Sequence, residues 1–67
     1  MNDAWTTEDQ VRGWVLTAGR RRPGFTAPEV GELLGVGLET VEAVLATMQR
    51  DGSIAWHESM GSFSVTP

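Results

Sequence analysis

The chain has 67 residues and a formal net charge of −4, with five basic and nine acidic side chains. This length predicts one small domain over residues 1–67 and excludes a two-domain enzyme. The absence of cysteine excludes disulfides, thiolate nucleophiles and cysteine-based zinc sites. No apolar run approaches the roughly 20 residues that span a bilayer, and the first residues lack a signal-peptide layout, so we expect a cytoplasmic protein without membrane contact.

The first predicted helix covers about residues 7–18. Its start is ambiguous, because Thr6 with Asp9 and Thr7 with Gln10 both match a capping box. Gly19 is expected to end it. Apolar residues repeat along this segment at the i, i+3, i+4 and i+7 spacing of a buried helical stripe, namely Val11, Trp14, Val15 and Ala18.

The second predicted helix covers about residues 27–34 and has a well-defined start. Thr26 is placed to cap it, with Glu29 at the third helical position and Pro28 in the first turn. Gly35 is expected to end it in a left-handed conformation. Phe25 and Val30 occupy the positions of a hydrophobic staple, and the predicted buried stripe consists of Val30, Leu33 and Leu34.

The third predicted helix covers about residues 38–50, after a turn that contains Gly37 as the cap. Its buried stripe is predicted to consist of Val41, Val44, Leu45 and Met48. Asp51 and Gly52 are expected to stop it.

The spacing of apolar residues then changes from the helical period to strict alternation, which predicts a hairpin over about residues 54–66. A turn with an even number of residues pairs Trp56 with Phe63 and Ile54 with Val65, so that all four share one face of the hairpin. This register places Trp56 in the core, together with Trp14 of the first helix.

The order of these elements, helix, short helix, tight turn, longer helix and hairpin, resembles the winged helix-turn-helix family. The stretch from Thr26 to Ile54 carries the resemblance, which with the first helix and the wing covers nearly the whole chain. Gly31 lies one turn before Gly35, where two closely crossing helices need a small residue. Gly37 is a departure, since most members have Ser or Thr there. The predicted fold class is mainly α with a small β-hairpin, a three-helix winged helix-turn-helix.

The resemblance implies a transcriptional regulator that binds DNA, as a dimer through the first helix, and inserts the third helix into the major groove. Three consecutive arginines before the second helix are candidates for phosphate contacts. The candidate DNA-binding residues are Arg20, Arg21, Arg22, Thr26, Glu39, Thr40, Ala43, Thr47 and Arg50.

The distribution of charge supports a different hypothesis. Residues 1–25 contain four arginines and three carboxylates, whereas residues 26–67 contain one arginine and six carboxylates. Nucleic-acid binders carry a basic patch. The alternative to DNA binding is therefore an acidic module that docks on a basic protein partner. The candidate partner-binding residues are Trp5, Leu16, Glu42 and Met60.

No catalytic function is expected from this sequence. His57 is the only histidine, and it falls on the predicted solvent face of a strand without a second metal ligand or a catalytic partner. We predict a binding protein that has no cofactor, no metal and no small-molecule substrate.

Overall fold

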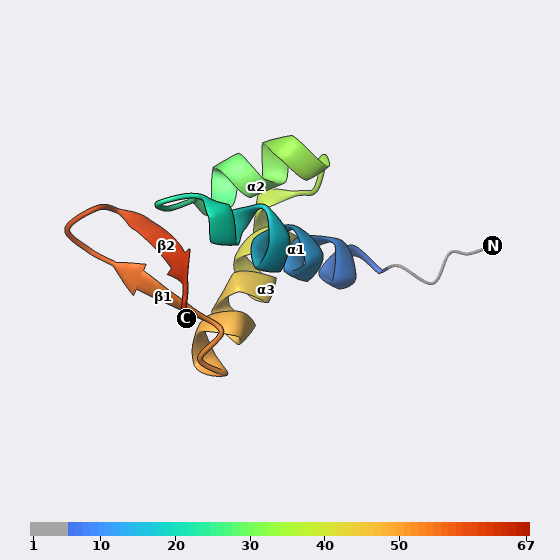
Figure 1. Cartoon of the computed structure of the whole chain (residues 1–67). Helices are drawn as coiled ribbons and strands as arrows, with labels where there is room; N and C mark the ends of the chain where they lie inside the picture. Colours follow the sequence, from blue (N-terminus) through green and yellow to red (C-terminus); the bar gives the residue numbers. More distant parts are fainter. Residues whose placement is uncertain (1–5) are drawn as a thin grey trace.

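A computed structural model describes residues 6–67, and it contains three α-helices followed by a two-stranded antiparallel hairpin (Figure 1). This winged-helix-like layout confirms the predicted fold class. No helix among the described residues is long and apolar enough to cross a bilayer. In chain order, the elements are α1 (Thr7–Thr17), the 3-10 turn η1 (Gly19–Arg21), α2 (Ala27–Leu34), α3 (Leu38–Arg50), β1 (Ile54–His57) and β2 (Ser62–Val65).

Helix α1 begins as one of the two predicted alternatives. The Thr6 hydroxyl accepts from the Asp9 backbone N–H at 3.1 Å, and the Asp9 carboxylate accepts from the Thr6 N–H at 3.2 Å. The helix ends at Thr17, one residue before the predicted end, with Ala18 as a right-handed cap, and Gly19 follows as the first residue of η1. Gly19 is buried against the rings of Trp14 and Phe25, so its role is close packing.

The corner between α2 and α3 is built as predicted. Thr26 caps α2, Gly35 ends it at φ 69°, and α3 starts directly after Gly37. A Cβ atom at Gly31 would lie 2.9 Å from the Val36 carbonyl oxygen, a distance that real Cβ contacts do not show. Only glycine therefore permits this approach of the turn to α2.

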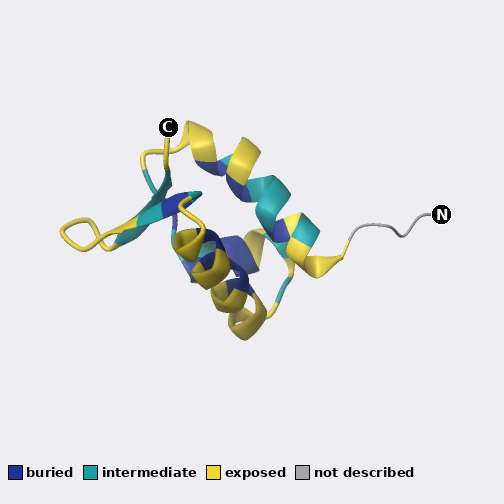
Figure 2. Ribbon diagram, turned by 90° about the horizontal axis from the view of Figure 1, so that it is seen from below, coloured by how far each residue is buried: buried dark blue, intermediate teal, exposed yellow. Residues whose placement is uncertain are grey.

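The hydrophobic core lies between the three helices, whose buried residues are drawn in dark blue in Figure 2. The predicted stripe of α3 is buried along its whole length. The prediction for α2 is wrong at Leu33, which is 54% exposed because an eight-residue helix has only a narrow face against α1 and α3. The buried core consists of Val11, Val15, Phe25, Ala27, Val30, Val41, Val44, Leu45, Met48 and Ile54.

The hairpin has the predicted register, with Ile54 opposite Val65 and Trp56 opposite Phe63. It is anchored to the helical body through β2, where Phe63 exchanges two backbone hydrogen bonds of 3.0 and 2.8 Å with Phe25, in the segment between η1 and α2. The prediction that Trp56 belongs to the core is wrong. Its side chain is 45% exposed, because the hairpin extends beyond the edge of the helical body (Figure 1).

Candidate interaction surface

The outward face of α3 is uncovered along its full length. Seven exposed residues form it: Glu39, Thr40, Glu42, Ala43, Ala46, Thr47 and Arg50. Arg50 in the last turn is the only basic residue among them, whereas Glu39 and Glu42 lie in the first half of the helix. Within residues 6–67, neither of these two carboxylates forms an ion pair. The face therefore presents unneutralised negative charge.

The three arginines before α2 do not act as one cluster. Arg22 forms an ion pair with Glu29 of α2, and its guanidinium carbon lies 5.3 Å from the centroid of the Trp14 ring. Arg20 and Arg21 are exposed on η1, and neither is paired with any described carboxylate. Arg22 thus ties η1 to α2, and two arginines remain directed to solvent.

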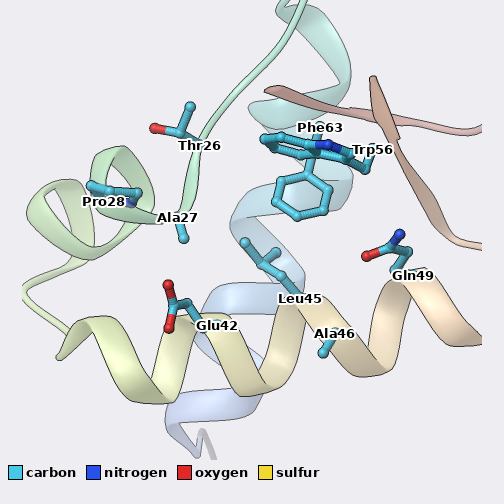
Figure 3. A pocket seen from close by; sticks show the side chains of 9 residues that line it. All are labelled: Thr26, Ala27, Pro28, Glu42, Leu45, Ala46, Gln49, Trp56 and Phe63. Atoms are coloured by element: carbon cyan, nitrogen blue, oxygen red, sulfur yellow. The ribbon is translucent and has the colours of Figure 1, made fainter. Parts of the chain in front are cut away.

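A groove that the sequence did not predict lies beside α3. It has a volume of about 450 Å³ and separates α3 and the start of α2 from the hairpin (Figure 3). The rings of Trp56 and Phe63 stand over Leu45, and Glu42 and Gln49 rise from α3 on either side of Ala46. The lining residues are Thr26, Ala27, Pro28, Glu42, Leu45, Ala46, Gln49, Trp56 and Phe63.

A row of aromatic rings holds the hairpin wall of this groove. The centroids of Trp56 and Phe63 are 4.9 Å apart at 64°, Phe63 stacks on Phe25 at 5.9 Å, and Phe25 meets Trp14 edge-on at 5.6 Å. Such pairs each contribute about 1 kcal/mol beyond simple area burial. Because Phe25 is 1% exposed, the row connects a half-exposed tryptophan to the centre of the core.

The sequence contained a partial signal for the groove. The alternating pattern correctly placed Trp56 and Phe63 on the same face of the hairpin. It could not show that α3 covers only part of that face, because this depends on the angle at which the hairpin leaves Ser53. The groove is thus a product of tertiary geometry.

The remaining candidate residues are spread over the surface. Leu16 on α1 is 40% exposed and Met60 at the hairpin turn is 63% exposed. Thr26 is half-buried, and its hydroxyl accepts from the Glu29 N–H at 3.4 Å. Trp5 lies outside the described residues. The structure therefore brings Glu42 together with the groove, but it does not bring Leu16 or the arginine turn there.

Titratable side chains do not gather into a metal site in the described part of the chain. No group of three or more His, Asp or Glu side chains among residues 6–67 could hold a metal ion. His57 is exposed, and its Nε2 lies 2.6 Å from the Ser64 hydroxyl across the hairpin. The pKa of Asp51 is lowered, chiefly by hydrogen bonds from the Ser53 hydroxyl and backbone N–H and also by the charge of Arg12. Asp51 caps the end of α3 and serves the fold there.

Comparison of the chain with models of known protein families, with curated proteins and with solved structures finds no match.

Proposed function

We propose that this domain is a winged-helix interaction module that binds a protein partner through the exposed face of α3 and the adjoining groove. The observation that carries the proposal is the groove itself, in which a half-exposed Trp56 faces apolar side chains beside Glu42, a carboxylate that forms no ion pair within residues 6–67. Aromatic side chains at the edge of a hydrophobic depression are typical of binding hot spots.

The charge of this face favours a basic partner. Glu39 and Glu42 lie on α3, Glu58 lies in the hairpin turn, and the hairpin contains no Lys or Arg. Complementary charge accelerates the encounter of two proteins and suppresses wrong partners. The same carboxylates repel the phosphates of a DNA groove.

A second candidate function is DNA binding, and two observations favour it. The first observation is that the helix-turn-helix stretch resembles a family rich in DNA-binding proteins. The other is the turn η1, which presents Arg20 and Arg21 to solvent without an ion-pair partner among the described residues. In this hypothesis, α3 enters the major groove and the two arginines contact the phosphates.

Fluorescence anisotropy with random-sequence duplex DNA separates these functions. DNA binding requires an affinity that falls steeply above about 50 mM salt and that decreases when Arg20 and Arg21 are changed to alanine. The interaction-module proposal expects no binding at tens of micromolar protein, which is the usual range of non-specific DNA affinity. Salt-dependent DNA binding that is abolished by the arginine changes would overturn the proposal.

A tagged form of the chain, expressed in its own host, provides the positive test. Glu42→Arg should release a bound partner, whereas Glu32→Arg on α2 should retain it. Both changes alter the net charge equally and both positions are exposed, but only Glu42 lines the groove. Equal retention by the two variants would contradict the assignment of this face.

A further inference from the structure

We infer that the groove beside α3 accepts a short basic segment of the partner, with apolar side chains inserted between α3 and the hairpin and Lys or Arg side chains against Glu42 and Glu39. The inference rests on the proposed function and specifies the chemistry of the partner. It follows from the combination of an apolar groove and a charged rim on one face.

The apolar side chains of the groove are held in place by their packing against the core. Leu45 forms its floor and is 1% exposed, and the rings of Trp56 and Phe63 are held by contacts that continue to Phe25. Pro28 forms part of the opposite wall at the start of α2. A preformed site of this kind loses little conformational entropy when it binds.

The length of the groove sets the spacing of the anchors. Its lining residues on α3 extend from Glu42 to Gln49, which at 1.5 Å per residue is about 10 Å. Two apolar side chains one helical turn apart, about 6 Å between their Cβ atoms, fit within this length. The small side chain of Ala46 lies between the two ends and leaves room for a close approach.

The charged part of the groove determines the sign of the charge that the partner must carry. Glu42 lines the groove and Glu39 lies one turn earlier on the same face of α3. Both side chains are exposed, and neither forms an ion pair within the described part of the chain. Arg or Lys residues that flank an apolar anchor would meet both carboxylates.

The same charges disfavour a second copy of this chain as the occupant. A two-fold contact with its axis beside Glu42 would bring Glu39 and Glu42 of one copy close to those of the other, where the like charges repel. A basic peptide segment satisfies the apolar groove and the acidic rim together.

The test uses a synthetic probe peptide of about 14 residues that can form a helix. Two leucines four positions apart lie on one side of this helix, and arginines occupy the other positions. Titration of the ¹⁵N-labelled chain should shift the Trp56 indole signal and the amides of Ala46 and Gln49, and leave those of η1 unchanged. Glu42→Arg should weaken binding at least about tenfold, or 1.4 kcal/mol. Glu32→Arg is the matched control and should bind as the original chain does. Two control peptides, with Glu in place of Arg or Ser in place of Leu, should not bind.

Several results would overturn the inference. These are the absence of shifts at millimolar probe, equal affinity of the Glu42→Arg and Glu32→Arg variants, binding of the acidic peptide, or a dimer of this chain that forms through Trp56. If the probe fails but the cellular partner is still lost only with Glu42→Arg, the interaction module stands and the basic segment is wrong. If duplex DNA shifts the same resonances in a salt-dependent manner, the proposed function itself is wrong.

Discussion

The corner between α2 and α3 and the hairpin that follows it are held in different ways. The corner has a buried core stripe on both helices, and the Val36 carbonyl oxygen lies so near Gly31 that no side chain fits between them. In the hairpin, only Ile54 belongs to the buried core, and Met60 at its turn is 63% exposed. The corner therefore maintains the fold, whereas the hairpin retains exposed surface that is available for binding. Substitutions in the two regions should differ accordingly.

The largest effect is expected at the corner glycine. Gly31→Leu should destabilise the domain by about 4 kcal/mol, enough to unfold much of a chain of this size, because the new side chain meets backbone that cannot move aside. Thermal unfolding followed by circular dichroism measures the loss. Gly13→Leu is the matched control, since a Cβ atom there has nothing within 4 Å. A stable Gly31→Leu variant would mean that the helices do not cross as described.

The same substitution at one methionine in each region allows a direct comparison of their stability. Met48→Ala should cost about 3 kcal/mol of unfolding free energy, because it leaves a cavity around a side chain that is 0% exposed. Met60→Ala, the same change at the hairpin turn, should alter stability by no more than about 0.5 kcal/mol. Denaturant unfolding of both variants provides the measurement. Equal losses would show that the hairpin turn is packed in solution.

A smaller effect is expected at the start of α2. Thr26→Ala removes the hydroxyl that accepts from the Glu29 N–H and should cost about 1 kcal/mol. Thr40→Ala in the exposed first turn of α3 makes the same chemical change without losing a cap, and it should leave stability within about 0.5 kcal/mol. Melting temperatures of the two variants test the difference. If Thr26→Ala were neutral, the cap would contribute nothing to the corner.

The smallest effect concerns the junction between the two regions. The lowered pKa of Asp51 means that its carboxylate stabilises the folded state above its ordinary pKa of 3.8, and that this contribution is lost as the pH falls through the lowered value. Asp51→Asn should therefore make the melting temperature less dependent on pH between about 5 and 2. Ser53→Ala should act in the same direction, because Ser53 supplies the main hydrogen bond. An unchanged pH profile in both variants would contradict this role.

Local signals predicted the corner accurately. The bounds of α2 and α3, the left-handed Gly35 and the need for a small residue at Gly31 all follow from residues within one or two turns of each other. The strand register followed from alternation and from the number of residues in the turn. Each of these features depends on neighbours in the sequence.

The candidate site was only partly predictable. The sequence correctly indicated that the face of α3 is exposed, and it identified Glu42 as a partner-binding candidate. It did not indicate the groove, the pairing of Arg22 with Glu29 or the exposure of Trp56. These features depend on how the hairpin and η1 are placed against the helices.

The amino-acid sequence alone determined where each helix begins and ends at the corner, which residues pair across the hairpin, and the sign of the charge on α3. Caps, periodicity and charge are properties of short segments, so they can be recognised without coordinates. Only the tertiary structure decided that Trp56 stands half-exposed over Leu45 and that Phe25 connects it to the core. The physical reason is that burial depends on the elements that cover a side chain, and here those elements lie far away in the sequence.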